Sequence, residues 1–199
     1  MPLEVSVRIP TGIKNYVRIQ GGIFSEQEDC SGVQIGLMNT AKNSSTAQAG
    51  LFNESEEVSN GVQFGLGNFC GEYTGVQVGA MNLSEYSSSL TQFGFWNEAN
   101  EIKGLQTGIL GNKSSAYHWD VASSGAQLGS MNISERLRGV QAGILNIAHE
   151  RLEGLQVGLI CYSNKGNYSQ LGLLTLRGAG PWYSRVSPIF GMHSDKIKD

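Results

Sequence analysis

The strongest constraint on this chain is a short unit in which a glutamine is followed two residues later by a glycine. The stretch "GVQVGAMN", residues 75–82, is one example, and Val76, Val78 and Ala80 alternate around Gln77 in it. The unit occurs eleven times, at intervals of 14, 14, 15, 14, 15, 14, 21, 14, 15 and 14 residues. Self-similarity at a nearly fixed period indicates a repeat architecture, so the chain is expected to fold as an array of similar pieces.

Each unit reads approximately G-φ-Q-φ-G-φ-φ-N-x-[A/S], where φ is an apolar residue, and a polar stretch follows it. Two glycines within five residues, together with β-branched neighbours, argue against a helix. Alternation with a period of two, closed by Asn and polar residues, predicts a strand followed by a turn. The sequence therefore predicts an all-β repeat protein.

The spacing leaves two all-β architectures open. After Gln34 the intervals alternate between short and long, so two units make a larger period of 29 residues. A parallel β-solenoid explains this period with a 29-residue coil made of two half-coils of about 14.5 residues each. An antiparallel meander closed into a β-barrel explains it with turns that differ in length at the two ends of the strands.

The solenoid is favoured because stacked parallel strands place identical residues above one another, where side-chain amides form ladders. A barrel that crosses a membrane needs about 9–11 residues per strand with an apolar outer face. The alternating face here offers three such positions per unit, as in Val140, Ala142 and Ile144. The predicted ladder residues are Gln34, Gln48, Gln63, Gln77, Gln92, Gln106, Gln127, Gln141, Gln156, Gln170, Asn39, Asn53, Asn68, Asn82, Asn97, Asn132 and Asn146.

The two ends of the chain depart from the repeat. Residues 1–19 and 176–199 lack the Gln-x-Gly signature, and the terminal units of a repeat protein must cover an open core edge. We therefore expect an N-terminal cap at 1–19, a repeat array at 20–175 and a C-terminal cap with a polar tail at 176–199. The array is expected to carry an insertion loop at 111–124.

The stretch "GVQAGILNIAHERLEGLQVGL", residues 139–159, resembles a group of bacterial surface-repeat proteins built from GxQxGxxN units, known from spirochaetes and Bacteroidetes. The resemblance covers about residues 20–175. It implies a bacterial protein that is exported or lies at the cell surface, and it brings no catalytic residue with it.

Composition narrows the choice of partners. The net charge of −3 argues against nucleic acid as the main partner, because nucleic acid requires a basic face. The start of the chain, "MPLEVSVRIP", lacks the pattern of a secretory signal, so the chain as written predicts a cytoplasmic location. The three cysteines and three histidines show no metal-ligand spacing, and we expect no metal and no cofactor.

The insertion loop holds the first candidate binding residues. Tyr117, His118, Trp119 and Asp120 lie in it, and insertions in repeat arrays often map to a binding face. His118 and Asp120 could form an acid–base pair, and Trp119 could stack on a sugar. The simpler interpretation is that these aromatic side chains pack onto the side of the solenoid.

The second candidate is a row of apolar residues, each four positions after a repeat glutamine. By strand parity this row shares a face with the glutamines, so it is exposed if the Val, Ile and Leu positions fill the core. A bend after the glycine would instead turn the row inward. An exposed row of this kind indicates contact with a partner or a membrane. The members predicted to bind a partner are Phe52, Met81, Trp96 and Met131.

The sequence thus predicts a non-enzymatic structural or interaction protein that presents a rigid β surface to a protein or glycan partner, or to itself. A membrane-active or pore-forming β protein is the alternative. A carbohydrate-active solenoid enzyme is the weakest hypothesis, because no defensible pair of carboxylates emerges from the spacing.

Overall fold

The computed structural model describes residues 5–10, 16–30, 32–44, 47–115, 122–178 and 186–194, and its secondary structure is built of β-strands. The chain divides into two compact units, unit 1 (Met1–Phe95) and unit 2 (Trp96–Asp199). The strands are β1 (Val5–Pro10), β2 (Tyr16–Cys30), β3 (Gly32–Ser44), β4 (Ala47–Ala49), β5 (Phe52–Ser114), β6 (Ser123–Lys165), β7 (Tyr168–Arg177) and β8 (Val186–His193).

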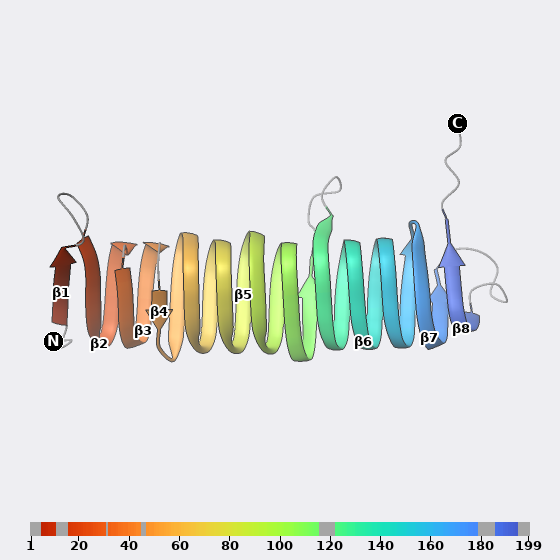
Figure 1. Cartoon of the computed structure of the whole chain (residues 1–199), viewed down its shortest axis with the longest axis horizontal. Coiled ribbons are helices and arrows are strands. Elements are labelled where there is room, and N and C mark those ends of the chain that lie inside the picture. Colours follow the sequence, from red (N-terminus) through yellow and green to blue (C-terminus); the bar gives the residue numbers. More distant parts are fainter. Residues whose placement is uncertain are drawn as a thin grey trace, which may run out of the picture. The chain divides into compact units, whose positions relative to one another are not determined.

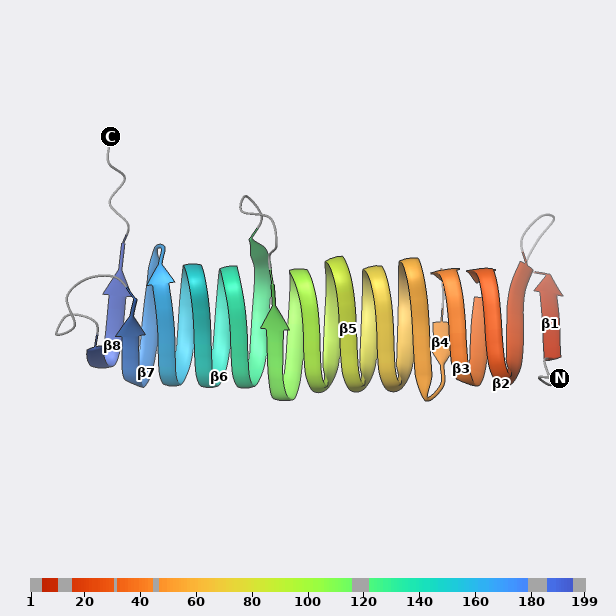
Figure 2. The ribbon, with the colours of Figure 1, turned by 180° about the vertical axis from the view of Figure 1, so that it is seen from behind.

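Neighbouring repeats pair in parallel and in register. In unit 1, β2 pairs with β3 so that Gln20 lies beside Gln34, and in unit 2, β6 pairs with β7 so that Gln156 lies beside Gln170. The long elements β5 and β6 wind through successive coils, which lie side by side in both views (Figures 1 and 2). The fold is therefore the predicted β-solenoid and not the antiparallel barrel.

The length of the coil corrects the prediction. Gln34 pairs with Gln48 one repeat later, so one coil holds a single unit of about 14 residues and not two half-coils in 29 residues. A coil with one more residue takes it up as an irregularity. Between β3 and β5 the pairing is Ala41 with Ser55 and then Asn43 with Val58. The alternation of 14 and 15 therefore records bulges, which leave the stacking of the glutamines unchanged.

The repeat glutamines point into the coil and bond one another. Each Nε2 donates to the Oε1 of the glutamine one coil earlier, at 2.7–2.9 Å. Several of them give their second N–H to a backbone carbonyl, as Gln156 does to Tyr162 at 3.1 Å. The donors are Gln48, Gln63, Gln77 and Gln92 in unit 1 and Gln127, Gln141, Gln156 and Gln170 in unit 2.

The asparagines form a second ladder that runs in the opposite direction. Each Nδ2 donates to the Oδ1 of the asparagine one coil later, at 2.8–2.9 Å. The linked members are Asn39, Asn53, Asn68 and Asn82 in unit 1 and Asn97, Asn112, Asn132 and Asn146 in unit 2. The second N–H usually reaches a backbone carbonyl, so these buried amides are well satisfied.

Small side chains complete the narrow interior. The residue two positions after the ladder asparagine is buried, as in Ala41, Ser55 and Cys70. In places the glutamine reaches across to this row, and Gln141 Nε2 lies 3.1 Å from Ser134 Oγ. A larger residue in this row would occupy space that the amides need. Apolar side chains fill one interior corner of unit 2, where Leu137, Ala148, Leu152 and Tyr168 form a cluster.

The two glycines of each unit serve different purposes. The glycine two residues before Gln bends the backbone, since Gly139 has a φ of 146° and an added Cβ would lie 1.9 Å from the Gly125 oxygen. The glycine two residues after Gln makes room for an asparagine, since a Cβ on Gly50 would lie 2.7 Å from Asn39 Nδ2. The coil therefore excludes side chains at both positions for backbone and ladder contacts.

Pairing reverses in the segments predicted to be caps. β1 pairs antiparallel with β2, from Val5 beside Gly21 to Pro10 beside Tyr16. β8 pairs antiparallel with β7, and Tyr168 lies beside His193. Pro188 lies within β8, and proline is confined to edge strands because it lacks a backbone N–H.

Replacing one ladder glutamine should strongly destabilise unit 2. Gln141→Met keeps the length of the side chain but removes the donor to Gln127 Oε1 and the acceptor for Gln156 Nε2. Each buried polar atom left unpaired costs about 1–3 kcal/mol, so we expect the free energy of unfolding to fall by about 3 kcal/mol. Urea unfolding measures this loss. Val140→Met, at the adjacent outward position, is the control and should change stability little.

Completing the asparagine ladder should stabilise unit 1. Ser25 lies beside Asn39 in the parallel register, and within the described residues no hydrogen-bond partner reaches Asn39 Oδ1. Ser25→Asn places a donor there, and we expect a gain of about 1 kcal/mol in urea unfolding. The same substitution in the small row, Ser55→Asn, should destabilise the chain. A loss of stability in Ser25→Asn would contradict this account of the ladder.

Candidate interaction surface

The branched apolar residues on either side of each glutamine point away from the interior. This overturns the expectation that Val, Ile and Leu fill the core, and the physical reason is that the paired amides already occupy the narrow coil. We call the outward positions one residue before, one after and three after each glutamine the outer face. In unit 1 its large side chains are between 41% and 62% exposed, and they are Ile35, Leu37, Leu51, Val62, Phe64, Leu66, Phe93 and Phe95.

Unit 2 has an outer face of the same kind. Its large side chains are between 36% and 70% exposed, and they are Ile109, Leu128, Val140, Ile144, Leu155, Leu159, Leu171 and Leu173. Polar residues interrupt it at Thr107 and Ser130, and the Ser130 hydroxyl donates to the Ile109 carbonyl at 2.7 Å. The outer face of unit 1 is therefore the more continuous apolar surface.

The row predicted to bind a partner adjoins the outer face. Residues three and four positions after a glutamine both point outward, as Leu37 and Met38 do, because the coil turns a corner after the glycine. Phe52 is 47% and Met81 is 44% exposed, whereas Trp96 and Met131 are only partly exposed. The Trp96 ring lies over the Cα of Gly111. The exposed apolar surface is thus wider than the row alone.

The residues of the insertion loop stay a prediction. Tyr117, His118, Trp119 and Asp120 lie outside the described residues. The coil that leads into this loop contains one ladder member that the repeat pattern missed. Asn112 follows Gln106 by six positions instead of five, because an extra residue is taken up by a bulge between Gly108 and Gly111.

Charged side chains lie away from the outer face. The sequence has no charged residue at any outer-face position, whereas ion pairs connect neighbouring coils elsewhere. Examples are Lys42 with Glu57 at 3.1 Å and Arg136 with Glu150 at 2.6 Å. Exposed pairs of this kind contribute about 0–1 kcal/mol each, so their main effect is to make the rest of the surface polar. Each unit therefore has one apolar face and a polar remainder.

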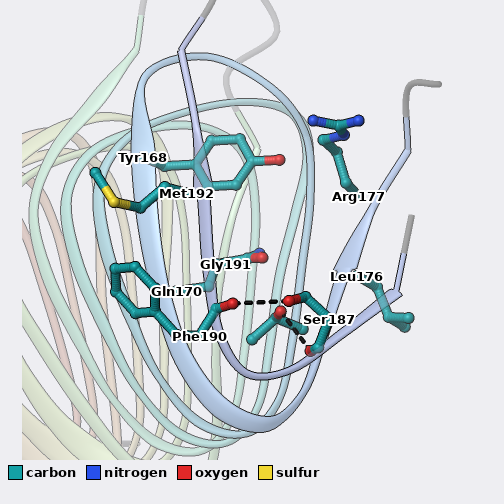
Figure 3. A pocket seen from close by; sticks show the side chains of 9 residues that line it. Tyr168, Gln170, Leu176, Arg177, Ser187, Phe190, Gly191 and Met192 are labelled. Carbon is teal, nitrogen blue, oxygen red and sulfur yellow. Dashed lines mark hydrogen bonds between the residues drawn. The ribbon is translucent and has the colours of Figure 1, made fainter. Parts of the chain in front are cut away.

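A small hollow of about 160 Å³ lies between β7 and β8 at the end of the interior. Figure 3 shows Tyr168, Gln170 and Ser187 around it. Its polar groups bond one another, since Thr175 Oγ1 donates to the Ser187 carbonyl at 2.7 Å and Ser187 Oγ to the Phe190 carbonyl at 2.8 Å. This hollow is the closure of the coil by β8.

The described thiols are unsuited to nucleophilic chemistry. Burial raises the pKa of Cys70 to about 12, against weaker lowering by Ser84 and Gln77, and burial also raises the pKa of Cys161. The reactive species is the thiolate, which these sites disfavour. Within the described ranges, no group of three or more His, Cys, Asp or Glu residues is placed to hold a metal ion.

Comparisons with protein-family models, with curated proteins and with solved structures find no match to this chain. The resemblance to bacterial surface-repeat proteins therefore stays a prediction. Among the described residues, no helix is long and apolar enough to cross a membrane. The class that the structure defines is a β-solenoid with amide ladders inside and an apolar face outside.

Burial of Cys70 should make stability depend on alkaline pH. Its pKa rises from 9.0 in the unfolded chain to about 12 in the fold, so the folded state keeps the proton longer. The contribution is fully present below pH 9 and is lost as the pH rises toward 12. We expect Cys70→Ser to lose less stability than the wild type between pH 8 and pH 10.5 in urea unfolding. Equal pH slopes for the two proteins would contradict this.

Proposed function

We propose that this chain is a non-enzymatic structural and interaction protein whose outer face binds an apolar surface of a protein partner. One observation carries the proposal, namely a continuous, uncharged apolar surface on unit 1 whose large side chains are about half exposed. Exposed apolar patches larger than a few hundred Å² on soluble proteins mark interaction sites. The proposal assigns no chemical step to the chain.

The ladders support this function because they fix the backbone beneath the outer face. Each outward residue sits between two positions whose side chains or hydrogen atoms are held inside the coil, as Phe64 sits between Gln63 and Gly65. A surface held in this way loses little conformational entropy on binding. Rigid, extended surfaces are what repeat proteins commonly use for recognition.

A protein partner fits the outer face better than a glycan or an anionic membrane. Glycan recognition requires polar groups that bond sugar hydroxyls, and the outer face of unit 1 offers few polar side chains apart from Thr91. Surfaces that lie on anionic membranes carry Lys and Arg beside their apolar residues, whereas this chain has a net charge of −3. Contact with neutral lipid is the alternative that the experiment below distinguishes.

Placing charges on the outer face should abolish binding. The triple variant Phe64→Lys, Leu66→Lys and Phe95→Lys alters exposed side chains and should keep the fold. Burial of each apolar group contributes about 1.5–3 kcal/mol, so we expect a loss of affinity of at least about 100-fold. Retention on phenyl resin, and retention of proteins from an extract of the source cells by the immobilised chain, measure this loss.

A matched control adds the same three charges elsewhere. Asn60, Thr74 and Tyr86 are exposed and lie outside the outer face, so their replacement by Lys should leave binding unchanged. If the two triple variants and the wild type retain the same proteins, the outer face is not the binding surface. Flotation of the wild type, but not of the outer-face variant, with vesicles of phosphatidylcholine would replace the protein partner by lipid.

A further inference from the structure

The outer face of unit 1 alternates between large and small side chains from one coil to the next. We call the outer-face residues of one coil a rung and name it by its glutamine. At the position after the glutamine, the rungs of Gln34, Gln48, Gln63, Gln77 and Gln92 carry Ile35, Ala49, Phe64, Val78 and Phe93. Adjacent parallel strands lie about 4.8 Å apart, so ridges recur about every 9.6 Å with a groove between them.

The deepest groove is the Gln77 rung. It carries Val78 and Ala80, between the ridges made by Phe64 with Leu66 and by Phe93 with Phe95. The ridges are prominent, since Phe64 is 62% and Phe95 is 51% exposed, while Val78 and Ala80 are only partly exposed. A partner that fills this groove must present large side chains with the same spacing.

A second copy of the same face has that spacing. A two-fold axis that runs along the strands, midway between the Gln63 and Gln77 rungs, reverses the order of the rungs and keeps each position along the strand. It places Phe64 opposite Val78 of the second copy, and Phe93 opposite Ala49 of the second copy. A two-fold axis along the stack would instead place Phe64 opposite Phe64 of the second copy. Close packing requires large side chains to meet small ones, which selects the first arrangement.

The area available is sufficient for a stable dimer. Eight large apolar side chains of this face are each about half exposed, and a side chain of this size offers about 200 Å² in full. They therefore offer about 800 Å², which is the amount each partner buries in a typical specific interface. No charged residue at an outer-face position has to lose its water in the contact.

We infer that the outer face of unit 1 packs against the same face of a second copy of this chain, as two sheets do in a β-sandwich. This inference rests on the proposed function and names its partner. The contact is isologous, with Phe64 and Leu66 of each copy seated over Val78 and Ala80 of the other.

A size swap tests the pairing. Sedimentation velocity of the wild type should show a species of twice the 21.4 kDa chain mass. Val78→Phe sets Phe against Phe, and Phe64→Val leaves a gap, so each single variant should weaken the dimer at least tenfold. The double variant Phe64→Val with Val78→Phe exchanges ridge and groove and should restore the dimer. Circular dichroism checks that the coils stay intact, because both residues point outward.

A crosslink provides a second readout that does not depend on affinity. In a Cys30→Ser background, Ala49→Cys with Phe93→Cys should give a covalent dimer with a short bis-maleimide, because these positions face each other across the axis. Within one chain they lie three rungs apart. Each single variant should give no covalent dimer.

Three results would overturn the inference. They are a wild type that stays monomeric at 100 µM, a dimer that is unaffected by either single variant, and a double variant that fails to regain dimerisation. The first of these leaves the proposed function standing if the outer-face charges still abolish retention of a different protein. Loss of the proposed function itself would show as unchanged retention in the outer-face variant.

Discussion

The hydrogen bond between like side-chain amides one coil apart is the interaction on which this structure depends. A buried amide costs several kcal/mol if it is unpaired, and here each inner glutamine both donates to one neighbour and accepts from the other, as Gln63 and Gln141 do. The asparagine ladder runs in the opposite direction, so the aligned amide dipoles of the two ladders oppose each other. Both ladders require parallel strands in register at about 4.8 Å, which fixes the coil.

A polar interior reverses the usual arrangement of a half-buried strand. Because the amides and small residues fill the coil, residues such as Val62, Phe64 and Leu66 face outward. The outer face is therefore a direct consequence of the ladder and does not arise from incomplete packing. The proposed binding function and the proposed dimer both follow from it, since a rigid apolar surface without charges is stabilised when another apolar surface covers it.

The sequence was sufficient to predict stacked parallel units and the residues of both ladders, because Gln and Asn recur at positions where only stacking makes use of them. It gave the wrong coil length, since an alternation of 14 and 15 residues fits two half-coils as well as single coils with bulges. It missed Asn112, which a bulge brings into line. The period of two coils has its counterpart on the surface, where Phe64 and Phe93 alternate with Ala49 and Val78.

The sequence by itself determined which residues share a face, because a strand alternates with a period of two whatever surrounds it. It also determined that like amides would meet, because the repeats are nearly equal in length. Only the tertiary structure decided which face is inside. That choice depends on the width of the closed coil, which admits Gln77 and Asn82 with their hydrogen bonds, and it leaves the apolar face to the outside.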